Sequence, residues 1–437
     1  MKITFIGAGS TVFCKNVLGD CILSPKLPEF EIALLDIDEK RLDESYALID
    51  ALRNKYKPSV EVKKYLATDE KQTEEAFRGA NYVINAIQVG GYKPCTVTDF
   101  KIPKKYGLQQ TIGDTLGIGG IFRGLRTIPV MKAYCDVMER VCPNALLLNY
   151  TNPMSILSGY LQRNTKIKTV GLCHSCQVVV SQINERSLKE EKLKDVDYTL
   201  GGINHMCWLL TLTDKEGNDL YPLFKEKFNK VKPRWDLVRL EMMNRFGYYN
   251  TESSEHTAEY HPYFIKSKYP LNILRYNIPI DEYPRRCIAQ IWRWKRLRKK
   301  ILNNGNVEHT RSHEYGSYII EACETSEPYK IYGNVLNNGL ITNLPDNACV
   351  EVPIIIDKNG LNPQPVGALP EQLSALNMTH IAVHEMTIKA AETLDKNYIY
   401  MAAYLDPHTR DQLSLPKIKS LCDDLIKAHG EWLPKFK

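Results

Sequence analysis

Apolar and polar positions alternate along the first 171 residues as the strands and helices of a layered α/β fold require. Short apolar runs predict six strands, and apolar residues at helical spacing lie between most of them. This alternation predicts a Rossmann-type parallel sheet with crossover helices on its faces. The predicted strands cover residues 3–6, 32–35, 60–62, 82–86, 145–148 and 168–171, and the clearest helices cover 39–56 and 119–141.

The spacing is less regular after residue 171. Apolar runs predict strands at 208–212 and 350–356, and helices are predicted at 282–302, 381–405 and 418–432. A chain of 437 residues exceeds the size at which one hydrophobic core usually keeps growing. We therefore expect two packed domains, an α/β domain over residues 1–175 and an α+β domain over residues 176–437.

Composition and charge narrow the class of protein. The 57 basic and 51 acidic residues leave a formal charge of +6, too small an excess to indicate a nucleic-acid partner. Twelve cysteines are scattered singly, which favours a reduced, cytoplasmic protein over a disulfide framework. The chain runs from Met1 directly into a strand signal, and no apolar run approaches the ~20 residues of a membrane span, so neither a secretory peptide nor a membrane partner is expected.

One stretch of the chain is strongly basic and carries Trp292 and Trp294 at helical intervals. We interpret it as a solvated helix face or a contact between subunits, in preference to a nucleic-acid or membrane surface. Its basic residues are Arg285, Arg286, Arg293, Lys295, Arg296, Arg298, Lys299 and Lys300.

The turn after the first predicted strand has the features of a dinucleotide site. Its residues are Gly7, Ala8, Gly9 and Ser10. Glycine lets the backbone approach a pyrophosphate, which the following helix N-terminus stabilises. Asp36 closes the second strand, where a carboxylate would bind the ribose hydroxyls and repel a 2′-phosphate, so NAD is favoured over NADP. Val12 replaces the third small residue of the fingerprint, and the alternative is that the glycines merely turn the chain while Asp36 caps a helix.

The segment Cys173-His174-Ser175-Cys176 follows the sixth predicted strand, at the edge where open α/β sheets bind ligands. A redox pair would need a thioredoxin-like context, and a structural zinc site would need a second ligand pair at short spacing. The remaining interpretation makes Cys173 one ligand of a catalytic metal, with His205 as its partner. A single histidine is more often an ordinary packed residue, so this alternative stays open for His205.

Several motifs together resemble glycoside hydrolase family 4, in the same order and along the whole chain. A second set resembles the melibiase-type α-galactosidases of that family, from which Cys176 departs because valine is usual there. The family motifs are Gly7 to Ser10, residues 149–153, 170–175, 202–205 and 350–353, and those of the α-galactosidase type are residues 90–100, 251–256, 332–335 and 406–409.

The resemblance implies a mechanism that uses NAD and a divalent metal such as Mn²⁺. In that mechanism NAD⁺ oxidises the sugar at C3, a base removes the C2 proton, the aglycone is eliminated, water adds, and NADH reduces C3 again. Such a chemistry needs a cation to spread the charge of an enolate. By position, Cys173 and His205 match the metal ligands, and Asn152 matches a residue beside both nicotinamide and substrate.

The remaining roles are less specific. His174 is proposed to assist departure of the leaving group, since an imidazole titrates near neutrality, or else only to bind a sugar hydroxyl. Tyr260, His256 and Glu252 are the candidates for the C2 base. Asp114 is a candidate ligand of a sugar hydroxyl, or else an ordinary turn residue. Arg286 or Arg285 is a candidate for orienting the substrate, or else faces solvent.

We therefore expect hydrolysis of terminal α-galactosides by a homodimer or homotetramer, with substrate, metal and subunit contacts in the second domain. The alternatives are the same mechanism on α-glucosides or α-galacturonides, a 2-hydroxy-acid dehydrogenase, and an NAD-sensing protein without catalysis. The dehydrogenase alternative arises because malate and lactate dehydrogenases share the dinucleotide turn and an Asn-Pro pair after a strand.

Overall fold

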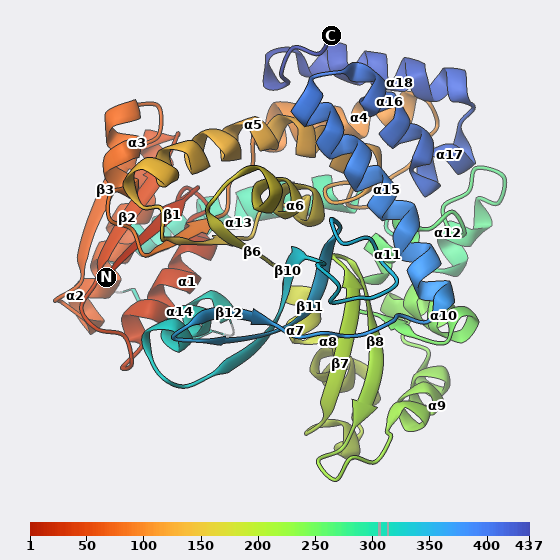
Figure 1. Cartoon of the computed structure of the whole chain (residues 1–437), viewed down its shortest axis with the longest axis horizontal. Coiled ribbons are helices and arrows are strands. Elements are labelled where there is room, and N and C mark those ends of the chain that lie inside the picture. The colour runs from red at the N-terminus through yellow and green to blue at the C-terminus, as the bar shows by residue number, and fades with distance from the viewer. Residues whose placement is uncertain (305–306, 313) are drawn as a thin grey trace.

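A computed structural model of the chain describes residues 1–304, 307–312 and 314–437, without the side chains of residues 297 and 299–304. Within these residues one sheet of 12 strands runs through the molecule (Figure 1). Its first part has the order β3-β2-β1-β4-β5-β6, with all neighbours parallel, as in a Rossmann fold. The six strands are β1 (Lys2–Ile6), β2 (Glu31–Asp36), β3 (Glu61–Leu66), β4 (Tyr82–Asn85), β5 (Leu146–Asn149) and β6 (Lys168–Leu172). The predicted fold class is confirmed.

The strands of the second half extend the same sheet. β10 pairs antiparallel with β6, and the order continues β10-β11-β7-β8-β9, while β12 pairs with β11. The pairing of β6 with β10 needs glycine on both strands. A Cβ on Gly171 would lie 2.5 Å from Ser158 Oγ, and one on Gly333 would lie 2.8 Å from Ile354 Cδ1. The division at residue 175 stays a prediction. The strands are β7 (Asp197–Ile203), β8 (Met206–Thr213), β9 (Tyr249–Asn250), β10 (Tyr329–Leu336), β11 (Cys349–Asp357) and β12 (Gly360–Pro363).

Helices cover both faces of the parallel part: α5 and α6 pack on one face, and α1, α2 and α14 on the other (Figure 1). No described helix combines the length and the apolar character that crossing a membrane would take. The helices of the first half are α1 (Thr11–Leu23), α2 (Glu39–Tyr56), α3 (Glu70–Phe77), α4 (Val97–Lys105), α5 (Gly117–Val141), α6 (Met154–Asn164), α7 (His174–Gln177) and α8 (Val179–Ile183).

The second half adds a layer of helices around the antiparallel strands, and short π- or 3₁₀-helical turns connect several elements. The helices are α9 (Tyr221–Val231), α10 (Leu237–Phe246), α11 (Ser254–Tyr260), α12 (Leu271–Arg275), α13 (Glu282–Asn304), α14 (Tyr315–Glu324), α15 (Glu371–Thr393), α16 (Lys396–Leu405), α17 (Pro407–Gln412) and α18 (Leu415–His429). The turns are η1 (Gly91–Thr96), η2 (Asn184–Leu188), η3 (Glu191–Leu193), η4 (Arg234–Asp236) and η5 (Gly430–Trp432).

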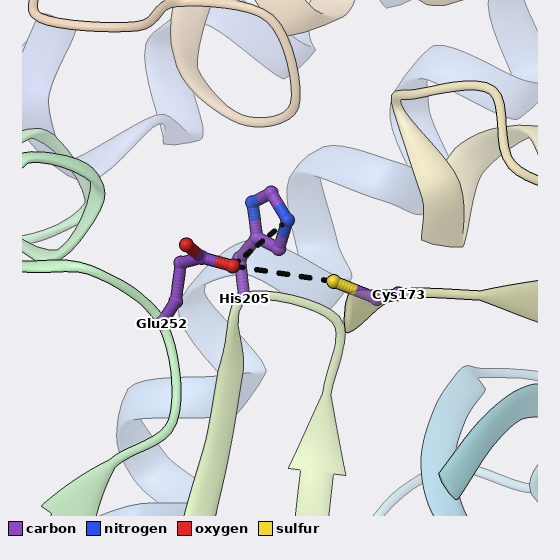
Figure 2. A group of neighbouring side chains, drawn as sticks. All are labelled: Cys173, His205 and Glu252. Carbon is purple, nitrogen blue, oxygen red and sulfur yellow. Dashed lines mark hydrogen bonds and ion pairs between the residues drawn. The ribbon is translucent and has the colours of Figure 1, made fainter. Parts of the chain in front are cut away.

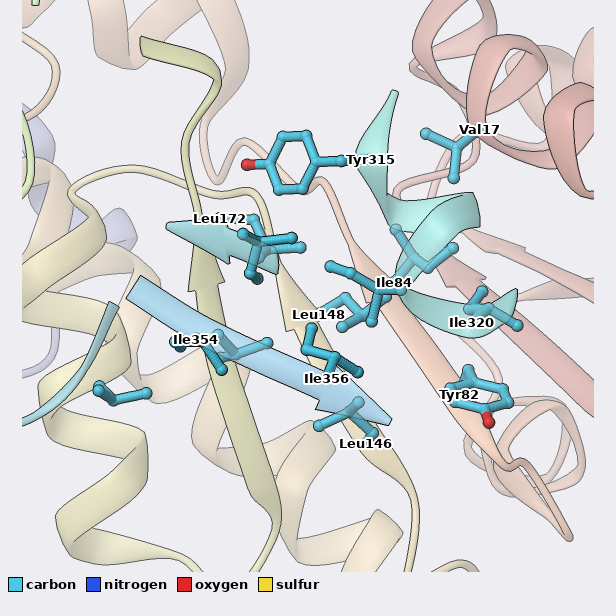
Figure 3. Close-up of a cluster of buried hydrophobic side chains, with 14 of the residues drawn as sticks. Val17, Tyr82, Ile84, Leu146, Leu148, Leu172, Tyr315, Ile320, Ile354 and Ile356 are labelled. Carbon is cyan, nitrogen blue, oxygen red and sulfur yellow. The ribbon is translucent and has the colours of Figure 1, made fainter. Parts of the chain in front are cut away.

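The core explains why the strands of the first half read as continuous apolar runs. Successive residues of β5 point to opposite faces, so Leu146 and Leu148 join one hydrophobic cluster and Leu147 joins the other. Figure 3 shows the first cluster, in which the strands pack against Val17 of α1 and Ile320 of α14. Burying each such side chain contributes about 1.5–3 kcal/mol.

The helix predicted over 381–405 is wrong as a single element. Leu394 adopts a left-handed backbone with φ 57°, which ends α15, and the Asp395 carboxylate caps α16 by accepting the Asn397 N–H. The basic stretch predicted as a helix forms α13, with Arg286 and Arg298 in ion pairs to Glu282 and Glu44. The side chains of Lys299 and Lys300 lie outside the described residues.

Candidate active site

The glycine turn after β1 makes close backbone contacts. Gly7 has φ +80°, and a Cβ there would lie 2.8 Å from Ala86 O. The N–H groups of Gly7 and Ala8 both donate to Leu35 O, at 2.9 and 3.1 Å, and the Ser10 hydroxyl donates to Gly7 O at 2.8 Å. These bonds hold the turn against the end of β2, at the N-terminus of α1.

Asp36 lies directly beside this turn. Its Oδ2 accepts the Gly9 N–H at 2.6 Å, and a Cβ on Gly9 would lie 2.8 Å from the same oxygen. Only glycine at position 9 therefore lets the carboxylate reach the turn. Val12 and Ile37, which follow the turn and Asp36, are exposed apolar residues, 47% and 67% accessible. Bare backbone, a carboxylate and exposed apolar side chains fit a dinucleotide with a ribose and a base.

Three elements bring Cys173, His205 and Glu252 together (Figure 2). Cys173 follows β6 and precedes α7. The turn between β7 and β8 carries His205, because Ile203 pairs with Met206 and leaves two residues between the strands. His205 has φ +63°, a backbone conformation that side chains other than glycine seldom adopt. Glu252 lies just beyond β9, the strand that pairs with β8.

The three side chains offer sulfur, nitrogen and oxygen to one point. Glu252 Oε2 lies 3.2 Å from His205 Nε2 and 4.0 Å from Cys173 Sγ, and all three ligand atoms lie within 4.8 Å of one another. A thiolate, an imidazole and a carboxylate can together hold a divalent transition metal and leave positions for a substrate. Sequence reasoning proposed Glu252 only as a base, since its place beside Cys173 depends on a contact across 79 residues.

Electrostatics in this cluster follow from burial. Burial lowers the pKa of His205, although Glu252 opposes the shift, so the ring is neutral as a metal ligand must be. Burial also raises the pKa of the Cys173 thiol well above its usual range, and the carboxylates of Glu351 and Glu252 add to this. Burial acts against ionisation of Glu252 too, but the positive charges that His205 and His256 carry when protonated in acid bring its pKa down to about 2. The site is thus anionic and suited to a cation.

The other two candidate bases line the same cluster. Tyr260 OH lies 2.9 Å from His205 Nδ1, and the rings of His256 and His205 are 4.8 Å apart. His256 Nδ1 is within 2.6 Å of Ser253 Oγ and 3.3 Å of Glu252 Oε1. Burial raises the pKa of Tyr260 well above its usual value, as do Glu259 and Asp114. The phenol is therefore protonated unless a cation lies nearby.

Asp114 reaches this site on a loop that Glu259 holds. The Glu259 carboxylate accepts the backbone N–H groups of Thr111 and Gly113, each at 2.7 Å, and that of Ile112 at 3.2 Å. Asp114 follows directly, with its carboxylate 3.6 Å from Arg123 Nη1. Sequence reasoning missed Glu259 and Arg123, because the first acts across about 146 residues and the second lies inside α5.

Comparison with known proteins agrees with these observations. The model of the family 4 glycosyl hydrolases matches residues 2–189, and the model of their C-terminal domain matches residues 200–409. The chain belongs to glycosyl hydrolase family 4. An α-galactosidase of Bacillus subtilis (strain 168) is 56% identical over 438 residues, covering 100% of both chains.

Two more distant comparisons also cover the whole of this chain. An α-galactosidase of Rhizobium meliloti (strain 1021) is 33% identical, covering 100% of this chain and 89% of the relative. A 6-phospho-α-glucosidase from gut microorganisms, solved in complex with NAD and Mn²⁺, has a TM-score of 0.84 at 20% identity, covering 100% of this chain and 99% of that one. At that identity the second likeness shows the shared fold alone.

The remaining predicted residues lie around the cluster. His174 is half-exposed, with Nε2 2.6 Å from Glu314 Oε2, and the rings of Phe13, Tyr150 and Tyr315 surround it. Asn152 is half-buried beyond the end of β5. Arg286 forms ion pairs with Glu255 and Glu282, and Arg285 is 2.8 Å from Glu282. The roles of all these residues stay predictions.

Proposed function

We propose that this family 4 glycosyl hydrolase is an α-galactosidase that acts on terminal, melibiose-like α-galactosides with the help of NAD and a divalent metal such as Mn²⁺. The observation that carries the proposal is the 56% identity over the whole chain with an α-galactosidase, in a protein whose Cys173, His205 and Glu252 converge. The twelve cysteines are all free thiols, which supports action in the reducing cytoplasm.

The described residues fit both cofactors. A Cβ at Gly7 or Gly9 would collide with Ala86 or Asp36, so the two glycines keep this turn tight and its backbone bare, and the turn together with Asp36 would hold NAD. Cys173 and His205, with Glu252 beside them, would hold the metal. When bound, NAD⁺ would accept and later return the hydride of the sugar C3, and the metal would stabilise negative charge on the oxidised sugar.

Within this reaction we assign the C2 proton to the phenol oxygen of Tyr260. The other two candidate bases already have close partners. Glu252 contacts His205 and accepts the Ser253 N–H at 2.9 Å, and His256 Nδ1 lies closest to Ser253 Oγ. The hydroxyl of Tyr260 lies 2.9 Å from His205 Nδ1, the two rings stack with centroids 6.0 Å apart, and Tyr260 directly follows Glu259, which anchors the Asp114 loop. His174, ringed by aromatic side chains, would assist the leaving group. Asp114, Asn152 and Arg286 would bind sugar hydroxyls.

The proposal is tested by following p-nitrophenol release from its α-galactoside, α-glucoside and α-galacturonide. The protein is first dialysed against a chelator and stripped of nucleotide, and NAD⁺ and Mn²⁺ are then added back separately and together. We expect the highest rate on the α-galactoside and only with both additions. A preference for another sugar would assign the same chemistry to that substrate. Net NADH formation with malate and no p-nitrophenol would contradict the proposal.

The proposed assembly is a homodimer or homotetramer, with the exposed basic face of α13 as a candidate contact. Ile288, Ile291 and Trp292 are exposed apolar residues on this helix. Light scattering during size-exclusion chromatography measures the subunit number directly. A monomer at micromolar concentration would contradict this part of the proposal.

A further inference from the structure

A second group of metal-binding side chains lies next to the cluster of Cys173. Cys176, Cys207 and Glu351 are each 0% exposed, and two sulfurs and a carboxylate oxygen from them lie within 4.8 Å of one another. Three neighbouring elements bring them together. Cys176 belongs to α7, Cys207 is in β8, and Glu351 is in β11, whose register places it opposite Gly202, the residue that also pairs with Cys207.

The carboxylate of Glu351 is incompletely satisfied. One oxygen accepts an N–H of Asn334 at 3.1 Å, and the Cys176 thiol and the Asn204 side chain lie beside the carboxylate, but buried Oε2 has no partner with good hydrogen-bond geometry among the described residues. The same is true of Asn334 Oδ1 and of both polar atoms of the Asn204 side chain, two residues beyond Gly202. Buried polar atoms are nearly always paired, so a concentration of unpaired ones marks a place for a further polar species.

We propose that Cys176, Cys207 and Glu351 bind a second divalent cation of the zinc class, distinct from the ion held at Cys173 and His205. Thiolate-rich sites select borderline-soft cations such as Zn²⁺ over harder ones such as Mn²⁺. Two sulfurs at about 2.3 Å from a tetrahedral ion lie about 3.8 Å apart, within the observed spread. Binding displaces the two thiol protons to solvent, and the carboxylate adds the third ligand.

Surrounding contacts suit a closed, structural ion. Thr251 Oγ1 accepts a hydrogen bond from the Cys176 thiol at 3.6 Å. Cys207 Sγ also contacts the backbone oxygen of Glu351 at 3.8 Å. Cys173 and Cys176 share one short segment, and His205 lies two residues before Cys207. A cation at this buried site therefore fixes the two segments that present ligands to the cluster of Cys173.

The experiment separates the two sites by removing the first. The full-length Cys173→Ser protein is dialysed against a chelator, incubated with Zn²⁺ alone or Cd²⁺ alone, and freed of unbound metal before elemental analysis. Thiolate-to-metal absorbance is recorded with Cd²⁺. A second variant adds Cys207→Ser, and a control adds Cys422→Ser instead, since Cys422 is an equally buried thiol in α18. Circular dichroism verifies that each variant is folded.

We expect one Zn²⁺ per chain in Cys173→Ser and in the Cys422→Ser control, and at least a tenfold loss of bound metal when Cys207 is replaced. A folded Cys173→Ser protein that binds no Zn²⁺, or equal binding with and without Cys207, would overturn the proposal. Anomalous diffraction at the zinc edge from crystals of the unaltered, zinc-loaded protein is independent of any variant. A peak between the two sulfurs and Glu351 supports the site, and a water molecule there refutes it.

Discussion

The anchoring of the Asp114 loop by Glu259 leads to a quantitative prediction. Glu259→Ala removes the acceptor of three backbone N–H groups in a buried loop. Each unsatisfied N–H costs about 1–3 kcal/mol, so we expect the loop to shift until water or another acceptor reaches it. Displacing a substrate ligand by about 1 Å can lower a rate about 100-fold. We therefore expect kcat/KM on an α-galactoside to fall by about that factor in Glu259→Ala.

The assay compares steady-state kinetics with thermal melting. Glu259→Gln keeps one carbonyl oxygen, so it should restore about half of the lost transition-state stabilisation, leaving a roughly 10-fold deficit. The control is Glu321→Gln, which changes another buried glutamate: Glu321 lies on α14, is 5% exposed and pairs with Arg311. That variant should melt at a lower temperature with kcat/KM unchanged. If Glu259→Ala loses stability like the control yet keeps kcat/KM within about twofold, the loop does not position substrate.

Three further changes test other parts of the structure. Gly7→Ala places a Cβ 2.8 Å from Ala86 O at φ +80°, so the turn must shift. The affinity for NAD⁺, measured by fluorescence, should fall at least tenfold, and an unchanged affinity would exclude this turn as the NAD site. Burial lowers the pKa of His384 to about 3, so below pH 6.5 the unfolded chain takes up a proton at this ring that the folded protein does not. The free energy of unfolding is therefore full above pH 6.5 and decreases as the pH falls. By pH 5 this group alone lowers the free energy of unfolding by about 2 kcal/mol. Urea unfolding of His384→Phe should therefore lose about that much less stability between pH 7 and pH 5 than the unaltered protein does. An equal loss of stability in both proteins would contradict this. Cys173→Ser should abolish Mn²⁺-dependent hydrolysis while leaving NAD⁺ affinity intact, and full activity in the presence of chelator would refute the metal role.

The residues that local patterns assigned to a dinucleotide site are neighbours in the structure. Gly7, Gly9 and Asp36 belong to one strand-turn-helix-strand unit, in which the order of the residues nearly determines their contacts. The six parallel strands followed from apolar runs, because the inner strands are buried on both faces of the sheet, whereas only Val62 of the edge strand β3 is buried.

The second half of the site depends on contacts between distant segments. The pairing of β10 with β6 extends the sheet and brings the β7–β8 turn near Cys173, and no local pattern encodes that pairing. The place of Cys173 after a sheet strand made it a candidate metal ligand with His205 as its partner, but the alternative of an ordinary packed histidine stayed open until the family resemblance was considered. Glu252 and Glu259 acquire their places through contacts across 79 and 146 residues, so their positions beside Cys173 and the Asp114 loop could be found only in the folded chain.

The central claim is that this protein cleaves α-galactosides by oxidation and elimination. Hydrolysis of p-nitrophenyl α-galactoside in D₂O, with NAD⁺ and Mn²⁺ present, tests it most directly when the galactose released is analysed by NMR. The account predicts deuterium at C2 of the product, because a base removes that proton and solvent replaces it. Complete hydrolysis with the original hydrogen retained at C2 would contradict the account and indicate direct displacement at C1.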